Sequence, residues 1–338
     1  MVIQLVLISI LVFFFAYSSG LHGGLNVMAA VVMTRALSRK QALLILVICE
    51  VTAPFLLGTA VARTVGKNII ALPSFDPKAV DLSVIFLMAA LIGSISWNLI
   101  TWSVGIPSSS SHALVGGMVG AAIFTYGRDT ILWKGFLYVA ASLILSPLVG
   151  LIFGFLFLRF ILHLSKDATP KINDFFNRMQ IPSSIALAIS HGANDIQKPI
   201  GLIAMSLLIL GISPTFHIPL WAVAGSATAT AFGTVTGGWR IIKTVGSKIY
   251  RLRSAHAFCA QTSSALVILG AALAGGPVST AHVVSSSILG VGASYRASAV
   301  RWGAAQDIIF AWLITIPASG MIAGLTSFLI KTIYSLIG

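Results

Sequence analysis

Two matched tracts interrupt an otherwise apolar chain and restrict the folds that are open to it. The first, Gly105–His112, reads Gly-Ile-Pro-Ser-Ser-Ser-Ser-His, and the second, Gly275–His282, reads Gly-Gly-Pro-Val-Ser-Thr-Ala-His. Proline lacks a backbone N–H and serine side chains compete for backbone groups, so neither tract can continue a lipid-facing helix. Inside a membrane, non-helical backbone persists only where protein buries it or a wet cavity solvates it. A pair of such tracts is typical of transporters built from repeats around a central site.

The composition predicts a polytopic membrane protein. Hydrophobic residues make up 57% of the 338 and charged residues only 9%, against about 25% charged residues in soluble domains. The apolar N-terminal run contains no lysine or arginine before Arg35, so we expect a retained membrane helix rather than a cleaved signal peptide. Several apolar segments are shorter than the roughly 20 residues of a full span, which predicts half-helices or re-entrant hairpins and leaves the number of spans open.

The net charge of +13 resides mainly in short loops between apolar segments. Lysine and arginine cluster in loops 35–40, 163–180 and 239–253. The positive-inside rule predicts that these loops are cytoplasmic and that the N-terminus lies outside. We therefore expect a multi-pass protein of the inner (plasma) membrane, surrounded by lipid, and not a nucleic-acid-binding protein.

The order of features indicates an internal duplication. The polar stretch 163–180 is the predicted cytoplasmic linker between two transmembrane repeats, 1–162 and 181–338. Each repeat contains a glycine-rich polar motif, then a basic amphipathic turn, then one of the two tracts. The strongly basic loop follows the glycine-rich motif in the first half but comes one loop later in the second. The repeats are therefore predicted to be inverted relative to each other.

Three acidic residues lie in apolar segments: Glu50, Asp195 and Asp307. Each costs about 2.5–3.5 kcal/mol at the centre of a span, so each needs a partner or a function. Asp195 belongs to Ser190–Gly201, a polar stretch that we predict to be a broken helix offering amides to an anion and carbonyls to a cation. Alternatively, Asp195 and Lys198 merely neutralise each other, but such a pair does not require the polar residues around it.

The two tracts supply hydroxyl groups that can donate hydrogen bonds to an oxyanion. The candidates are Ser109, Ser110, Ser111, Ser279 and Thr280. The alternative is ordinary N-capping of the helix that follows each tract. Capping and binding are compatible, because a helix N-terminus inside the membrane is itself an anion site.

Other polar residues near these motifs are candidates for cation coupling. A histidine can carry a proton, or it can pack and bond a backbone carbonyl, and an acidic residue can serve coupling or an interhelical contact. The coupling candidates are Asp195, Asn194, Glu50 and His22, with Asp195 as the place for a sodium ion. The secondary candidates are His112, His282, Gln197, Lys198 and Asp307.

The sequence carries no motif of a familiar enzyme. It has no Walker A loop, no HExxH, no CxxC pair and no Gly-x-Ser-x-Gly elbow, so ATP-driven pumping by this chain is unsupported. An intramembrane hydrolase would leave the duplicated tracts unexplained. We therefore expect neither an enzyme nor a bound cofactor.

The stretch His191–Gly201 resembles the signature of the inorganic phosphate transporter (Pit, PHO-4) family, and Thr34–Ala42, Pro107–Gly117, Gly237–Gly246 and Pro277–Gly290 are similar to its further motifs. The resemblance implies an all-helical, inverted-repeat symporter that takes up phosphate with Na⁺ or H⁺ by alternating access, often as a homodimer. It implies a site between two re-entrant hairpins and two broken helices. The implied substrate-binding residues are Asn26, Ser109, Ser110 and Ser111 in the first half and Asn194, Asp195, Ser279 and Thr280 in the second.

The first half departs from the family pattern at Gly23, where relatives have an acidic residue, and Ala281 lacks the hydroxyl of its counterpart Ser111. Moving each negative charge inward costs about 2.3 kcal/mol per 100 mV, so cations must accompany the anion. With one carboxylate missing, we expect proton coupling or fewer sodium ions. Phosphate is the expected substrate, and sulfate or a related oxyanion is the alternative, because removing a repulsive group shifts selectivity. A channel or a transport-inactive binding protein is a third alternative.

Overall fold

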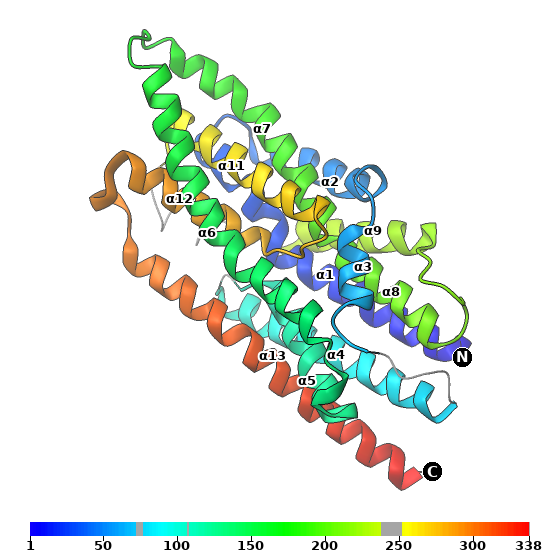
Figure 1. Cartoon of the computed structure of the whole chain (residues 1–338). Helices are drawn as coiled ribbons and strands as arrows, with labels where there is room; N and C mark the ends of the chain where they lie inside the picture. Colours follow the sequence, from blue (N-terminus) through cyan, green and yellow to red (C-terminus); the bar gives the residue numbers. More distant parts are fainter. Residues whose placement is uncertain (72–76, 107, 238–251, 338) are drawn as a thin grey trace.

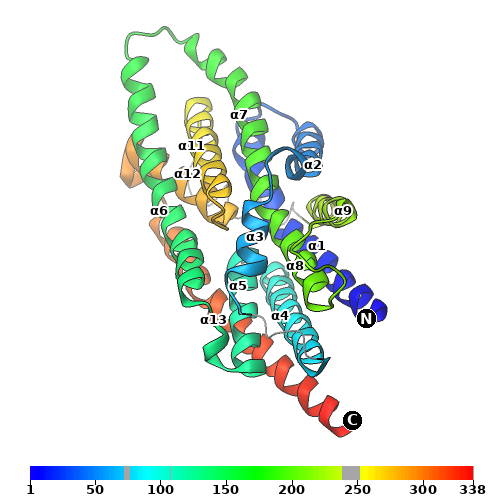
Figure 2. The same ribbon diagram turned by 45° about the vertical axis from the view of Figure 1, so that its right-hand side comes forward.

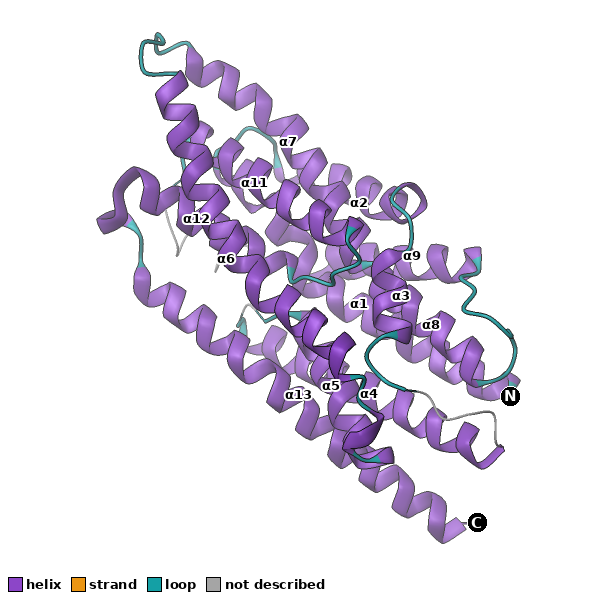
Figure 3. Ribbon diagram, viewed as in Figure 1, coloured by secondary structure: helices purple, strands orange, loops and turns teal. Residues whose placement is uncertain are grey.

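Helices make up almost all of the molecule. The computed structural model describes residues 1–338 except 72–76, 107, 238–251 and 338. Within these ranges the only strand-like pairing is an isolated bridge between Ile70 and Ile131, and Figure 3 shows helices joined by loops. The helices of the first half are α1 (Val2–Met33), α2 (Arg39–Leu56), α3 (Ala60–Lys67), α4 (Pro77–Val104), α5 (Ser110–Tyr126) and α6 (Trp133–Leu164). Those of the second half are α7 (Ile172–Asp195), α8 (Gln197–Ile209), α9 (Leu220–Gly237), α11 (Ser254–Leu273), α12 (Thr280–Arg296) and α13 (Trp302–Ile337).

The helices are those of a multi-pass membrane protein. Five of the described helices, α1, α4, α6, α11 and α13, are long and apolar enough to cross a membrane, and the bent pair α2 and α3 would make a sixth. Leu148 of α6 and Leu325 of α13 are 53% and 59% exposed, so these helices present apolar side chains outward, as lipid-facing helices do. The prediction of a polytopic, all-helical protein is confirmed.

The helix ends next to the basic loops lie at one end of the molecule. Thr34, at the end of α1, donates a hydrogen bond to the side-chain oxygen of Gln180 in α7 over 2.5 Å. Phe176 of α7 packs on Phe258 near the start of α11, with 5.7 Å between ring centroids. The end of α1 and the start of α11 therefore lie beside the first turns of α7. The N-terminus and the loop between α8 and α9 lie at the opposite end (Figures 1 and 2).

One predicted loop is shorter in the structure than we expected, and another lies mostly outside the described residues. The stretch 163–180 is non-helical only from 165 to 171, because α7 already begins at Ile172. Phe176 and Gln180 are buried, so one face of this charged segment packs against the bundle and stabilises a helix. Most of the loop 239–253 lies outside the described residues.

The described residues of both tracts begin and end in the same backbone conformation. Gly105 follows α4 with φ of 77° and Gly275 follows α11 with φ of 78°, a left-handed conformation that favours glycine. In each tract the N–H after the glycine bonds the carbonyl five residues earlier, which is the Schellman ending of a helix. Ser109 and Ser279 then accept a hydrogen bond from the N–H three residues on, and so cap α5 and α12.

Each half packs its last helix against the other half. α6 lies against α12, and α13 lies against α5 (Figures 1 and 2). Glycine permits the close approach: a Cβ at Gly154 would lie 2.5 Å from the carbonyl oxygen of Ser287, and one at Gly120 would lie 2.1 Å from that of Gly320. The helices that follow the tracts are thereby held between the two halves.

Candidate functional site

The two glycine-rich polar motifs differ in how far they interrupt their helices. The first, Gly20–Asn26, lies inside α1, which runs unbroken from Val2 to Met33. The second ends α7 at Asp195, and α8 starts again after Ile196 alone. Pro199 lacks the N–H that would bond the Asp195 carbonyl, which accounts for the interruption. The interruption is therefore narrower than we expected, and it is seen only in the second half.

Four ionisable side chains meet at this interruption, and we call them the charged cluster. They are Glu50 of α2, His191 and Asp195 of α7, and Lys198 of α8, and all four are buried. His191 lies between the carboxylates, with Nε2 3.2 Å from Glu50 Oε1 and Nδ1 3.1 Å from Asp195 Oδ2. The Lys198 ammonium pairs with Asp195 Oδ1. Buried charges persist when they are paired in this way, so the cluster explains how the bundle tolerates two carboxylates.

Both tracts reach the charged cluster. From the second tract, the Thr280 hydroxyl donates to Asp195 Oδ2 over 2.9 Å. From the first, the Ser111 hydroxyl accepts from Lys198 Nζ over 2.5 Å and donates to the Val278 carbonyl over 2.9 Å. The two tracts are far apart in sequence, yet a hydroxyl from each contacts the same ion pair: Thr280 bonds Asp195, and Ser111 bonds Lys198.

Asn194 and Thr234 hold the parts of the cluster in place. The Asn194 amide donates to the Gly276 carbonyl over 3.1 Å and accepts from the Val278 N–H over 3.2 Å. Both of its polar groups therefore bond the backbone of the second tract. The Thr234 hydroxyl of α9 donates to Glu50 Oε1 over 3.1 Å, while Glu50 Oε2 is buried without a hydrogen-bond partner among the described residues.

The other predicted hydroxyls form hydrogen bonds away from the charged cluster in this conformation. Ser109 and Ser279 are the N-caps of α5 and α12. Ser110 shares a hydrogen bond of 2.8 Å with Ser19 of α1. Capping, the alternative considered for the tracts, therefore accounts for two of the five hydroxyl groups as they stand.

The first-half candidates bond within their own part of the bundle. His22 contacts the Ser18 carbonyl and the Thr101 hydroxyl, at 3.2 and 3.1 Å. Asn26 donates to the His22 carbonyl over 2.8 Å, and its Oδ1 is buried without a partner among the described residues. Gly23 does face the cluster: a Cβ there would lie 3.0 Å from His191 Cε1.

Two secondary candidates contact each other where the tracts meet. The rings of His112 and His282 lie 4.7 Å apart, and His282 stacks on Trp312 at 3.8 Å. These histidines occupy matching positions in the two tracts, so their contact shows that the tracts meet end to end. Neither ring nitrogen of His282 has a hydrogen-bond partner in the described part of the chain.

Gln197 caps a neighbouring helix, and the side chain of Asp307 is not described. The side-chain oxygen of Gln197 accepts from the N–H groups of Val61 and Ala62, at 2.9 and 3.2 Å, and so caps α3. Asp307 belongs to α13, but its side chain lies outside the described residues.

Sequence reasoning gave no role to three groups that the structure places at the cluster. These are the His191 ring, the Thr234 hydroxyl and the Val278 carbonyl. His191 stands four residues before Asp195, a spacing that puts both on one helix face and that could have identified it. Thr234 lies in an apolar helix with no such signal, and a backbone carbonyl carries none.

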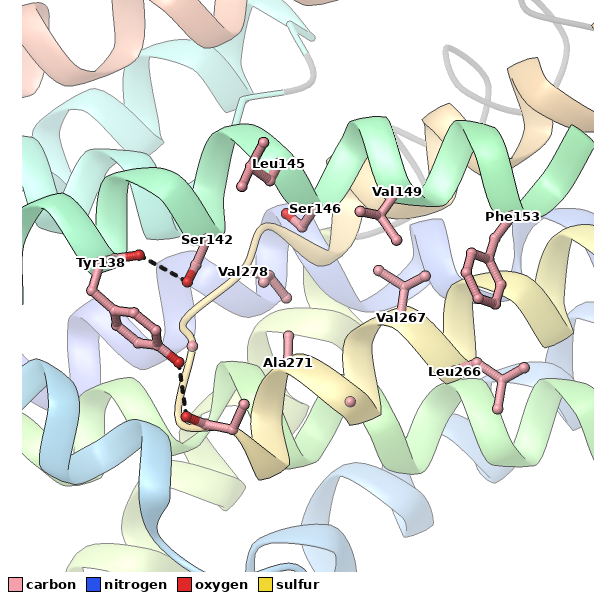
Figure 4. A pocket seen from close by; sticks show the side chains of 13 residues that line it. Tyr138, Ser142, Leu145, Ser146, Val149, Phe153, Leu266, Val267, Ala271 and Val278 are labelled. Carbon is pink, nitrogen blue, oxygen red and sulfur yellow. Dashed lines mark hydrogen bonds between the residues drawn. The ribbon is translucent and has the colours of Figure 1, made fainter.

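A separate cavity of about 540 Å³ lies between α6 and α11 (Figure 4). Its wall is formed by side chains such as Val149, Phe153 and Leu266, which are also exposed on the outside of the bundle. The one tyrosine hydroxyl in this wall, that of Tyr138, donates its hydrogen bond to the Ala274 carbonyl. This apolar, lipid-facing groove does not suit an oxyanion, whereas the charged cluster has both the donors and the charge.

The arrangement at the cluster can bind ions of both signs. The first turns of α5 and α12 have N–H groups without an intrahelical acceptor, and the helix dipole adds partial positive charge; both suit a small oxyanion. The carboxylates of Asp195 and Glu50 suit a cation. Since these groups share hydrogen bonds, an anion and a cation bound there would lie close together.

Comparison with known proteins points to one family. The sequence profile of the phosphate transporter family matches residues 19–323. A "Probable low-affinity inorganic phosphate transporter" of Rhizobium meliloti is 41% identical over 93% of both chains, and one of Bacillus subtilis is 38% identical over 99% of both. A solved structure described as a sodium-dependent phosphate transporter superposes with a TM-score of 0.87 at 25% identity, covering 98% of this chain and 99% of the other.

Proposed function

Because the chain belongs to the phosphate transporter family, we propose that it is a secondary active transporter that takes up inorganic phosphate together with a coupling cation. The observation that carries this proposal is the meeting of the α5 and α12 N-termini at the buried charged cluster. Each N-terminus adds hydroxyls and N–H groups that can bind phosphate oxygens. The relatives are transporters and not enzymes.

Phosphate would bind between Ser109–Ser111 and Ser279–Thr280. The bonds that now join Ser111 to Val278 and Thr280 to Asp195 would be exchanged for bonds to phosphate oxygens. Such an exchange keeps the number of hydrogen bonds similar, so the anion can enter a buried place without leaving donors unpaired. Sulfate is the alternative substrate and is distinguished by competition.

A cation has to accompany the anion for two reasons. The carboxylates of Asp195 and Glu50 would repel phosphate unless positive charge compensates them. In addition, each negative charge that moves inward costs about 2.3 kcal/mol per 100 mV of negative-inside potential. Symport with a cation answers both demands.

His191 makes a proton the favoured coupling ion. Both of its ring nitrogens face carboxylate oxygens, at 3.1 and 3.2 Å. A neutral imidazole has one N–H donor, whereas imidazolium has two, so the geometry suits the protonated ring. Gly23 supplies no carboxylate to a sodium site there. Binding and release of a proton at His191 would then change the charge next to the substrate.

Alternating access is supported by the packing of helices from each half against the other half. The repeats 1–162 and 181–338 each insert a tract and its following helix against the last helix of the other half. An inverted relation between the halves would make the same contacts available toward either side of the membrane. With the basic loops at the cytoplasmic face, the protein would reside in the inner (plasma) membrane.

The proposal is tested by uptake of labelled phosphate into proteoliposomes that contain the purified protein. We expect saturable uptake that an inward pH gradient drives above equilibrium, and weaker competition by sulfate than by unlabelled phosphate. Empty liposomes are the control.

Three results would count against the proposal. Non-saturating, purely dissipative flux would indicate a channel, and binding without counterflow would indicate an inactive receptor. Stronger competition by sulfate than by phosphate would reassign the substrate.

A further inference from the structure

All three N–H donors of the Lys198 ammonium bond protein oxygens. An ammonium group has three N–H donors. Its Nζ donates to the Asp195 carboxylate, to the Ser111 hydroxyl over 2.5 Å and to the Val278 carbonyl over 3.0 Å. The side chain is only 1% exposed, so water cannot take the place of these acceptors. In this conformation no donor is left for a bound anion.

The oxygens around Nζ form a ligand set that is typical of a small hard cation. They comprise one carboxylate, one hydroxyl and one backbone carbonyl, and hard cations are bound by such oxygens. Asp195 also ends α7, and the C-terminal end of an interrupted helix attracts cations. The three ligands come from α7, α5 and the second tract, so a cation here links both halves.

We propose that the Lys198 ammonium is a tethered cation that occupies a latent sodium site between the two tracts. A cation that is covalently bound to the protein cannot dissociate with the substrate. It neutralises Asp195 and holds the tracts together, but it contributes no ion to transport at this position. This inference rests on the proposed function, because it concerns which ion couples at that site.

Removal of the side chain should convert this position into a binding site for free Na⁺. Lys198→Ala leaves the three oxygens and opens the space of the ammonium. Lys198→Met removes the charge but fills the same space with an apolar chain of similar length. The two variants therefore separate loss of the charge from access of an ion, and Lys166→Ala, which removes an exposed lysine, is the control for net charge.

The experiment measures labelled phosphate uptake in proteoliposomes with Na⁺ or K⁺ at equal ionic strength. Wild type and Lys166→Ala should transport equally in both salts. Without Na⁺, Lys198→Ala should lose about 100-fold or more of its uptake, because the buried Asp195 carboxylate loses its ammonium partner at Oδ1. Added Na⁺ should restore a large part of the Lys198→Ala uptake and none of the Lys198→Met uptake.

A second measurement covers the case in which a variant does not transport. Na⁺, but not K⁺, should raise the melting temperature of detergent-purified Lys198→Ala, since a ligand that binds only the folded state stabilises it. Wild type and Lys198→Met should show no such difference. Absence of any Na⁺-specific effect in Lys198→Ala, or an equal effect in Lys198→Met, would overturn the inference. Wild type that neither binds nor transports phosphate would instead overturn the proposed function.

Discussion

The His191 ring lies between the carboxylates of Glu50 and Asp195, two residues that are 145 positions apart in the sequence. Its own position is fixed by α7, and Glu50 reaches it from α2. Because the ring touches both acids, a change of its charge alters the whole cluster. The coupling step can therefore be examined at this one residue.

We predict that His191→Gln loses the response of uptake to a pH gradient. Glutamine retains one N–H donor group but cannot carry a proton, so a proton-coupled step would be removed along with much of the rate. The measurement is the initial rate of phosphate uptake at fixed external pH while the internal pH is raised, which leaves the external phosphate species unchanged. Wild type should respond to the gradient, as should His163→Gln, whose histidine is exposed. A full response in His191→Gln would exclude His191 as the proton site.

The local sequence identified Asp195 and the tract hydroxyls, but not their partners. Asp195 stood out because a carboxylate is costly in an apolar segment. The bond from Thr234 to Glu50 joins helices from different halves, and only the packing of α9 against α2 creates it. For the same reason, the sequence did not separate Ser109, which caps a helix, from Ser111, which bonds Lys198.

At the scale of the helices, the N-termini of α5 and α12 depend on their serine caps. We predict that Ser109→Ala and Ser279→Ala each destabilise the protein by about 0.5–2 kcal/mol. The loss should be larger for Ser109, because its hydroxyl also lies 2.8 Å from the His112 ring nitrogen. The measurement is the denaturation midpoint of the purified protein, with the exposed Ser335→Ala as control. An unchanged midpoint in both variants would contradict the stabilising role of the two caps.

The sequence predicted that the two tracts interrupt helices. It did not predict that the first glycine-rich motif, Gly20–Asn26, lies within a continuous helix. A Cβ at Gly24 would lie 2.2 Å from the Thr234 hydroxyl, and one at Gly20 would lie 2.1 Å from the Thr230 carbonyl. These glycines allow α9 to approach α1, and no proline accompanies them. Glycine thus marks close packing in the first motif, while Pro199 accounts for the interruption in the second.

At the scale of the whole molecule, the asymmetry of charge predicts which end faces the cytoplasm. We expect Ser213→Cys, in the loop between α8 and α9, to react with a membrane-impermeant thiol reagent in intact cells. Lys166→Cys, at the opposite end, should react only after the cells are permeabilised. Cys49 and Cys259 are buried, so they should give little background. Labelling of Lys166→Cys in intact cells would reverse the assigned orientation.

Charge and motif order predict a duplication and an inversion, and both stay predictions; the sequence could not show how the two parts of the chain pack together. The exchange in which α6 lies against α12 and α13 against α5 depends on glycines such as Gly120 and Gly154 that fit between helices. Many apolar segments of this chain carry glycine, so the presence of glycine alone does not select the partner helix. Tertiary packing decides it.

The central claim is that the two tracts jointly hold one phosphate beside the charged cluster. It is tested most directly by an experimental structure of the protein with arsenate, a phosphate analogue whose arsenic scatters anomalously. The account predicts a single anomalous peak within hydrogen-bonding distance of Ser111 and of Thr280. A peak that contacts only one tract, or one that lies in the apolar groove between α6 and α11, would contradict it.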